Sequence, residues 1–180
     1  MNDVEIALAT PEDVPALGPI ELAAATLFPP GIVPRDMATS SLPLASLEDA
    51  RAAGRLWVAR VGGRPVGFLV VAKLLDGTPF VLELDVHPEH QRRGIGTALL
   101  AAASAWAAWT PARALTLTTF RHVPWNAPFY ARRGFVEISA AELGPGLRAR
   151  LAEEAAHGLD PAKRVAMLLR LGIGGGEADP

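Results

Sequence analysis

Apolar and polar residues alternate along several short segments of this chain, which predicts a sheet of six to seven strands. In the first segment, Val4, Ile6 and Leu8 recur with the period of two that is typical of a half-buried strand. Glycine, proline and aspartate turns bound the other segments. The predicted strands cover residues 4–9, 56–61, 65–75, 80–86, 114–119, 135–138 and 164–171.

Two of these strands carry additional local signals. The turn Gly62-Gly63-Arg64 predicts a hairpin between the second and third strands. Strict alternation along 80–86 predicts two different faces for that strand. The apolar face would hold Phe80, Leu82, Leu84 and Val86, and the polar face would hold Glu83, Asp85 and His87.

Helical patterns separate the strands. Thr10 as an N-cap followed by Pro11 predicts a first helix that runs to about Phe28. The segment from there to Ser46 is rich in proline and serine and predicts a long loop, and Gly54 ends a short helix at 47–53. Further helices are predicted at 94–109, 126–133 and 145–157. This order indicates a mixed α/β chain in which 80–86 and 114–119 are parallel neighbours.

The composition indicates one folded domain. The chain has 180 residues, of which 50% are hydrophobic and 20% charged, enough to bury a continuous core. We expect the domain to cover 1–171, with 172–180 as a flexible C-terminal tail. The formal net charge of −2 lacks the basic excess of nucleic-acid-binding proteins, so we expect no nucleic-acid partner.

Cysteine and hydropathy restrict the chemistry and the compartment. The absence of cysteine excludes disulfides, thiolate metal sites and cysteine nucleophiles, and we expect no metal cofactor. The amino terminus lacks the basic and apolar regions of a signal peptide. The longest low-charge stretch, residues 98–109, is too short to span a bilayer. We therefore expect a cytoplasmic protein without a membrane partner.

The segment 86–97, Val-His-Pro-Glu-His-Gln-Arg-Arg-Gly-Ile-Gly-Thr, joins a predicted strand to a predicted helix. Gly94 and Gly96 remove side chains there, so the backbone N–H groups of 92–97 can face an anion at the positive end of the helix. Arg92, Arg93 and Gln91 add donors, and a pyrophosphate fits this description. The alternative is an ordinary glycine-containing helix start with two solvated arginines. No Lys-Ser or Lys-Thr follows the glycines, so the segment is not a Walker A loop.

Two motifs in this region resemble those of the GCN5-related N-acetyltransferase (GNAT) family. Residues 86–100 resemble its acetyl-CoA signature, and Asn126 to Phe135, Asn-Ala-Pro-Phe-Tyr-Ala-Arg-Arg-Gly-Phe, resemble a second family block. The resemblance is close over residues 56–138. Outside this span, only the order of predicted helices and strands is similar to that of the family. It implies an acyl-CoA N-acyltransferase fold, with a mixed, mostly antiparallel twisted sheet flanked by helices. It also implies a splayed parallel strand pair at the cofactor site and acetyl-CoA as co-substrate.

The resemblance also implies roles for individual residues. Backbone groups of the strand before the glycine turn would bind the pantetheine arm, and the Val86 N–H would donate to the thioester carbonyl. Asn126 would hold the pantetheine or cap its helix, two roles that are compatible. The implied cofactor-binding set is Leu84, Val86, Gln91, Arg92, Arg93, Gly94, Ile95, Gly96, Thr97 and Asn126.

Candidate acid and base residues come from the same segments. Tyr130 is the only tyrosine, one helical turn after Asn126. A phenol with a pKa near 10 can protonate a thiolate whose pKa lies near 8.5, the alternative being a buried core tyrosine. Glu83 is the leading candidate for the general base. Asp85 and His87 share its predicted face, and a solvated strand face is the alternative for all three.

The positions of other polar residues in the chain predict whether they lie at the surface or near an acceptor pocket. Glu21, on the first helix, is expected at the surface, although it could reach an acceptor pocket. His122 and Trp125 follow a strand end, where they either shape that pocket or simply pack. His90 is expected to be an ordinary loop residue.

The sequence therefore predicts an N-acetyltransferase that transfers the acetyl group of acetyl-CoA to a primary amine. Direct attack in a ternary complex is expected, because the chain has no cysteine to carry an acetyl group. The alternative is a non-catalytic module that binds or senses acyl-CoA. The acceptor, a small molecule or a peptide, stays open, and a homodimer is one candidate assembly.

Overall fold

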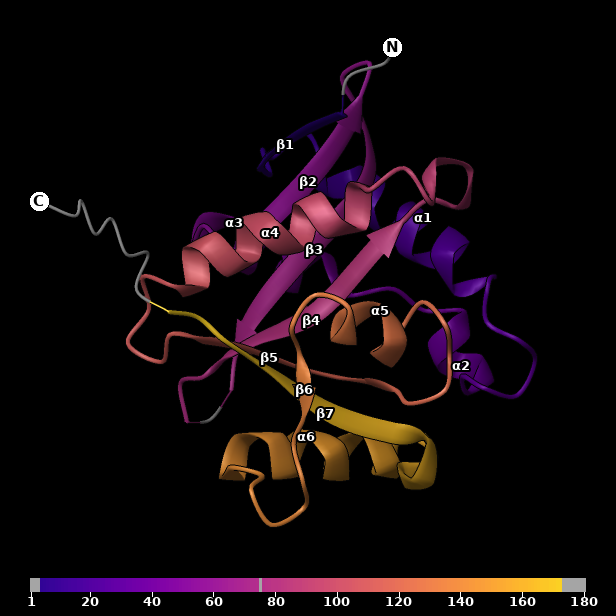
Figure 1. Cartoon of the computed structure of the whole chain (residues 1–180). Helices are drawn as coiled ribbons and strands as arrows, with labels where there is room; N and C mark the ends of the chain where they lie inside the picture. The colour runs from indigo at the N-terminus through magenta and orange to yellow at the C-terminus, as the bar shows by residue number, and fades with distance from the viewer. Residues whose placement is uncertain (1–3, 75, 173–180) are drawn as a thin grey trace, which may run out of the picture.

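A mixed sheet of seven strands forms the centre of the computed structural model, which describes residues 4–74 and 76–172 (Figure 1). The strand order is β1-β2-β3-β4-β5-β7-β6, and only β4 and β5 are parallel neighbours. The strands are β1 Val4–Leu8, β2 Leu56–Val61, β3 Arg64–Lys73, β4 Pro79–Val86, β5 Ala114–Phe120, β6 Val136–Glu137 and β7 Arg164–Arg170. The predicted fold class is confirmed.

Helices cover both faces of this sheet. They are α1 Val14–Ala25, α2 Arg35–Ala38, α3 Leu44–Ala52, α4 Ile95–Ala107, α5 Ala127–Ala131 and α6 Pro145–Ala156, with short 3-10 turns at Pro88–His90 and Pro161–Lys163. Alternate β2 and β3 residues pack to opposite sides: Trp57 and Leu69 lie in the core under α4, whereas Val58 and Phe68 lie in the core under α1 and α3. The α4 helix crosses in front of β2 and β3 in Figure 1. None of the described helices is long and apolar enough to cross a membrane.

The predicted hairpin and the predicted splayed strand pair are both present. Gly62 and Gly63 have φ angles of 57° and 76°, the two positive values that a tight type I′ turn requires. Between β4 and β5 the described register holds a single pair, Phe80 with Thr116, and the Thr116 hydroxyl donates to the Pro79 carbonyl at 2.9 Å. Beyond this pair the two strands separate, which leaves one edge of the end of β4 without a strand partner.

The predicted faces of β4 are wrong at one end of the strand, because β4 contains a bulge. Along β3 the register advances by one residue, from Val70 to Val71, while along β4 it moves by two, from Glu83 to Val81. The extra residue, Leu82, reverses the alternation. Phe80 and Leu82 therefore pack on the side of the sheet opposite to Leu84 and Val86. Alternation of apolar and polar residues in the sequence does not show where a bulge inserts one extra residue.

The start of the first helix also differs from the prediction. Asp13, not Thr10, is the N-cap, and α1 begins at Val14. The Asp13 carboxylate accepts hydrogen bonds from the Thr10 backbone N–H at 2.7 Å and from its hydroxyl at 3.0 Å. Asp13 is buried and pairs with Arg60 of β2, with Oδ1 and Nε 3.0 Å apart. A tertiary ion pair thus fixes the chain in a turn before the helix starts.

The proline-rich segment between α1 and α3 is more ordered than predicted. Pro34 and Pro43 are the N-cap residues of α2 and α3, so the prolines begin helices there instead of excluding them. Gly54 follows the end of α3 with a φ of +65°, as predicted. Most of the predicted tail, residues 173–180, lies outside the described residues.

Candidate active site

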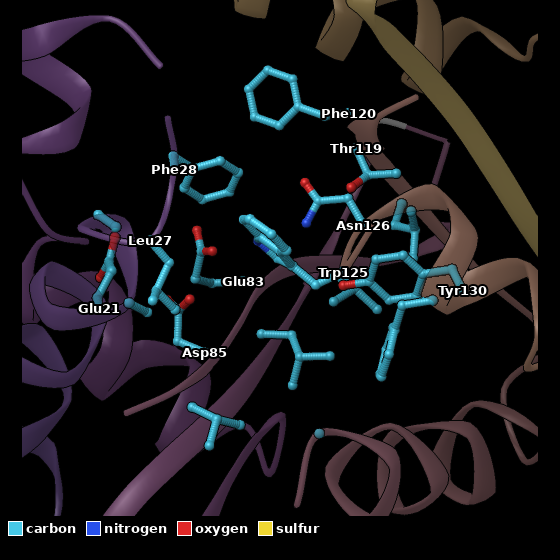
Figure 2. Close-up of a pocket in the computed structure, with 18 of the residues that line it drawn as sticks. Glu21, Leu27, Phe28, Glu83, Asp85, Thr119, Phe120, Trp125, Asn126 and Tyr130 are labelled. Atoms are coloured by element: carbon cyan, nitrogen blue, oxygen red, sulfur yellow. The ribbon is translucent and has the colours of Figure 1, made fainter. Parts of the chain in front are cut away.

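A cavity of about 1020 Å³ lies where β4 and β5 separate (Figure 2). Its lining comes from segments far apart in the sequence, namely α1, the connection from α1 to α3, β4, the start of α4, β5, α5, α6 and β7. We divide it into two parts. The glycine-turn half comprises residues 90–97 together with Asn126 and Tyr130, and the carboxylate half comprises Glu21, Glu83, Asp85, Leu27, Phe28, Phe120 and Trp125.

The backbone of the glycine turn presents free donors. Gly94 is the N-cap of α4 and has a φ of +80°, a left-handed conformation that glycine adopts without strain. Arg92 also has a positive φ, 57°. None of the backbone N–H groups of 92–97 donates a hydrogen bond to another described residue. Six consecutive donors at the positive end of a 13-residue helix fit an anion with several oxygens, such as a diphosphate.

Neighbouring side chains hold this turn in place. A Cβ added at Gly96 would lie 3.5 Å from Cζ of Phe129, so the glycine brings α4 close to α5. The Arg133 guanidinium stacks on the Phe129 ring at 3.5 Å from its centroid and donates through Nε to the Thr97 hydroxyl at 3.0 Å. All predicted turn residues line the cavity except Arg93, which is exposed and is not part of the lining.

The edge of β4 offers backbone groups to the same cavity. The His87 N–H donates to the Val66 carbonyl of the neighbouring strand at 2.8 Å. In an antiparallel ladder the residues that bond to the partner strand alternate with residues that do not. The N–H groups of Leu84 and Val86 therefore point away from β3, into the gap left by β5. The Val86 carbonyl accepts from Nε2 of Gln91 at 3.3 Å, which ties the turn to the strand.

Tyr130 lies on α5 with its hydroxyl directed into the cavity (Figure 2). The residue is only 9% exposed, and its ring makes edge contacts with Phe129 and Phe135 at centroid distances of 5.1 and 5.5 Å. The hydroxyl makes no hydrogen bond with any described residue. Burial, followed by the nearby Glu83 carboxylate, raises the pKa of Tyr130, so the phenol keeps its proton at neutral pH.

Asn126 occupies the N-cap position of α5 but makes no side-chain capping hydrogen bond. Its backbone carbonyl instead accepts from the Phe129 N–H at 2.8 Å, and the side chain lines the cavity. Of the two roles considered from the sequence, the capping role is wrong. The amide is free to contact a ligand.

Three carboxylates converge in the other half of the cavity. Burial and then the Glu21 carboxylate raise the pKa of Glu83 to about 7. Burial and then Glu83 hold the pKa of Asp85 well above its ordinary range. Glu21 accepts from the Leu42 backbone N–H at 2.9 Å, and burial raises its pKa as well. The expected surface position of Glu21 is wrong, because the connection to α3 folds back over α1.

The histidines are placed differently from the expectation. His87 leaves the polar face of β4 and caps the following 3-10 turn, where its Nδ1 accepts from the Glu89 N–H at 3.4 Å. His122 is exposed and does not line the cavity, whereas Trp125 does. His90, expected to be an ordinary loop residue, lines the cavity, and its Nδ1 is buried without a partner among the described residues.

The sequence analysis did not predict a charged network that lines the same cavity as the carboxylate half. Glu154 of α6 is 4% exposed and accepts from Nε of Arg164 at 2.9 Å. Arg150 approaches the same carboxylate at 3.3 Å, and the Thr118 hydroxyl donates to it. In the sequence these residues look like the solvated face of a helix and the first residue of a strand. Only the packing of α6 against β7 buries them.

Aromatic rings form the wall opposite the carboxylates. Phe28 lies 5.5 Å from Phe120 and 5.9 Å from Trp125, measured between ring centroids. Among residues 4–74 and 76–172, no group of three or more His, Asp or Glu side chains is arranged to hold a metal ion. The geometry therefore provides an anion cradle, a protonated phenol and a carboxylate with a pKa near neutrality around one cavity.

Comparison with known proteins finds a family match over the middle of the chain. Residues 52–137 match the family described as acetyltransferase (GNAT) domain, a span that contains both motifs, β4 and the glycine turn. The match also includes Glu83 and Tyr130. It begins after α1, so Glu21, Leu27 and Phe28 of the carboxylate half lie outside it, and it ends before α6 and β7.

Solved structures of the same fold cover nearly the whole chain. N-acetylglutamate synthase from Neisseria gonorrhoeae, with coenzyme A and N-acetyl-glutamate, has a TM-score of 0.68 and 21% identity over 94% of this chain and 35% of that one. This chain thus spans about a third of that enzyme. The ribosomal-protein-S18-alanine N-acetyltransferase from Escherichia coli has a TM-score of 0.64 and 16% sequence identity, over 99% of this chain and 100% of that one. The paia N-acetyltransferase from Thermoplasma acidophilum, in complex with coenzyme A, has a TM-score of 0.64 and 15% sequence identity, over 93% of this chain and 99% of that one.

Proposed function

We propose that this chain transfers the acetyl group of acetyl-CoA to a primary amine in a ternary complex, because residues 52–137 match the acetyltransferase (GNAT) domain. The observation that carries this proposal is the meeting of three features in one cavity. They are the free N–H groups of the glycine turn, the unpaired edge of β4 and the facing pair of Glu83 and Tyr130. Coenzyme A in the solved structures of this fold supports the choice of co-substrate.

The glycine turn would hold the diphosphate of the co-substrate. The N–H groups of 92–97 donate to its oxygens, and the Arg92 side chain adds positive charge at the mouth of the cavity. The N–H groups of Leu84 and Val86 lie between this turn and the carboxylates. They would bind the pantetheine arm, with the Val86 N–H donating to the thioester oxygen, where one such donor contributes about 3 kcal/mol to the transition state. Asn126 would contact the same arm.

Glu83 and Tyr130 would move the protons of the transfer. As the amine nitrogen bonds to the acetyl carbon, Glu83 accepts the N–H proton, directly or through one water molecule. With a pKa of about 7, Glu83 is ionised in a large fraction of molecules at neutral pH. As the carbon–sulfur bond breaks, the Tyr130 hydroxyl donates a hydrogen bond and then its proton to the departing sulfur. The proton that Glu83 has taken up then replaces the one lost by the phenol.

The proposal is tested by calorimetric titration with acetyl-CoA, followed by a thiol-release screen over a panel of amines. We expect binding at a single site and release of thiol with at least one class of amine. Binding without release from any amine would favour the acyl-CoA-sensing alternative. No binding would overturn the assignment of the glycine turn, and the transferase proposal with it.

A further inference from the structure

The carboxylate half of the cavity brings together three acidic side chains, Glu21, Glu83 and Asp85. Within residues 4–74 and 76–172, neither Glu21 nor the β4 carboxylates Glu83 and Asp85 form an ion pair with a lysine or arginine. The charges of two arginines of the lining, Arg150 and Arg164, oppose the rise in the pKa of Glu83 without forming an ion pair with it. Arg150 and Arg164 both pair with Glu154, at 3.3 and 2.9 Å.

Two polar groups in the same cavity lack a partner. Oδ2 of Asp85 is buried and accepts no hydrogen bond from an N–H or hydroxyl group of the described residues, and the neighbouring Asp85 and Glu83 carboxyl groups are close enough to share a proton. The Tyr130 side chain is nine-tenths buried, and its hydroxyl also has no hydrogen bond within the described part of the chain (Figure 2). A buried polar group without a partner is costly. The Tyr130 hydroxyl is assigned to the departing sulfur, so Oδ2 of Asp85 is the group suited to a ligand that brings an N–H donor.

The carboxylates occupy two separate positions. Glu83 is close enough to Tyr130 to raise its pKa and is assigned above to the reacting amine. Glu21 comes from α1, where the Leu42 N–H fixes one of its oxygens and leaves the other available. Asp85 is close to both carboxyl groups, because the charges of Glu83 and Glu21 each raise its pKa. Leu27, Phe28 and Trp125 are apolar and line the cavity around these positions (Figure 2).

We infer that the acceptor carries a second cationic group in addition to the amine that is acetylated, with an apolar linker between them. Glu21 and Asp85 bind the second cation, whose charge favours their ionised forms, while Glu83 serves the reacting amine and the aromatic wall contacts the linker. This inference rests on the proposed function and specifies its substrate class as diamines. An acceptor with a carboxylate at its far end would place that group against Glu21 and would be disfavoured by like charge.

The test compares acceptors that differ only in the far group. Three matched compounds are 1,6-diaminohexane, hexylamine and 6-aminohexanoate, together with their analogues of four to eight carbons. We expect kcat/KM to be highest for a diamine, about tenfold to a hundredfold above the alkylamine of equal length, as expected for hydrogen bonds to a charged group. The amino acid should be the poorest of each trio.

A variant locates the effect. Glu21→Gln keeps an oxygen that can accept from the Leu42 N–H but removes the charge. The ratio of kcat/KM for diamine over alkylamine should therefore fall about tenfold. Glu12→Gln is the matched control, because Glu12 is exposed, precedes α1 and does not line the cavity. Its ratio should equal that of the unmodified chain.

The outcomes separate this inference from the proposed function. Thiol release from hexylamine that equals or exceeds release from every diamine would overturn the inference and leave the transferase intact. Preference for 6-aminohexanoate would also overturn it, in favour of a zwitterionic acceptor. An unchanged ratio in Glu21→Gln would remove Glu21 from the second-cation position. If no amine releases thiol although acetyl-CoA binds, the proposed function itself has failed.

Discussion

The two halves of the cavity differ in how the chain builds them. The glycine-turn half comes mainly from one continuous segment, residues 90–97, and its donors are backbone groups whose positions follow from the helix start and from Gly94. The carboxylate half is assembled from α1, β4, the end of β5 and the segment before α5, and its chemistry depends on side chains and burial. A continuous segment with fixed backbone geometry is readable from sequence. A surface assembled from distant segments is not.

The difference has a functional counterpart. The family match covers the glycine turn, β4 and α5, whereas α1, α6 and β7 lie outside it. Under the proposed function, the residues that bind the co-substrate all lie within the matched span, whereas the acceptor site also uses Glu21, Leu27 and Phe28, which lie outside it. Substitutions in each half should therefore affect different kinetic constants.

The largest effect is expected in the glycine turn. Gly96→Glu would place a carboxylate beside the bound diphosphate. Two like charges about 4 Å apart repel by about 4 kcal/mol near a protein surface, which corresponds to about a thousandfold loss of acetyl-CoA affinity. Calorimetry measures this loss.

Gly96→Ala is the matched control for that variant. Its Cβ would meet Phe129 at an ordinary contact distance of 3.5 Å, so affinity should stay within about twofold of the unmodified protein. Tight binding by Gly96→Glu would show that the diphosphate lies elsewhere.

A smaller but more selective effect is expected at Tyr130, where the two halves meet. Tyr130→Phe keeps the ring contacts with Phe129 and Phe135 and removes the hydroxyl. The kcat should fall about a hundredfold, in the range of general acid catalysis, while the Kd for acetyl-CoA changes by less than about twofold. Steady-state kinetics and calorimetry on the same preparation separate these quantities. Equal losses in both would assign Tyr130 a structural role.

Glu83 should give a pH-dependent effect. In the unmodified protein, kcat/KM should rise as the pH passes through about 7, because the base must lose its proton. Glu83→Gln should lose activity about tenfold to a hundredfold at pH 8 and much less at pH 6, which a pH–rate profile measures. A profile for Glu83→Gln that still rises near pH 7 would assign the base to another group, with Asp85 the next candidate.

Glu83→Gln should raise the stability of the protein in the same pH range in which it lowers the activity. The folded chain holds the Glu83 proton up to about pH 7, whereas the unfolded chain releases it near 4.5. The folded state therefore binds one more proton between these values, so the free energy of unfolding falls as the pH rises from 4.5 to 7. Above pH 7, Glu83→Gln should be more stable than the unmodified protein by on the order of 3 kcal/mol, as urea unfolding would measure.

The exposed Glu89, in the turn that follows β4, provides the control. Glu89→Gln should shift neither the pH–rate profile nor the unfolding curve, because its side chain is 81% exposed. A stability gain in both variants would indicate a general effect of removing negative charge.

The smallest effect is expected at the aromatic wall. Trp125→Ala removes a ring that lies 5.9 Å from Phe28. The KM for the acceptor should rise about threefold to tenfold, in line with the contribution of one aromatic contact, and the Kd for acetyl-CoA should not change. A loss of acetyl-CoA affinity instead would move Trp125 to the glycine-turn half.

Local patterns predicted most elements of the fold correctly. The β2 bounds, the Gly62-Gly63 turn, the helix after Gly94 and the parallel pair at β4 and β5 are all present as expected. Two errors share one cause. The bulge at Leu82 and the displaced helix start at Asp13 both depend on contacts with strands elsewhere in the sheet, which no local pattern contains.

The sequence by itself offered the glycine turn, Tyr130 and Glu83 as candidates, through residue type, short spacing and the resemblance of two motifs to a known family. Only the tertiary structure decided that Glu21 belongs to the cavity and His87 does not. It also decided that α6 and β7 bring Arg150, Glu154 and Arg164 beneath the carboxylate half. The physical reason is burial: a side chain acquires a raised pKa or an unpaired charge only when other segments fold over it, and those segments are remote in the sequence.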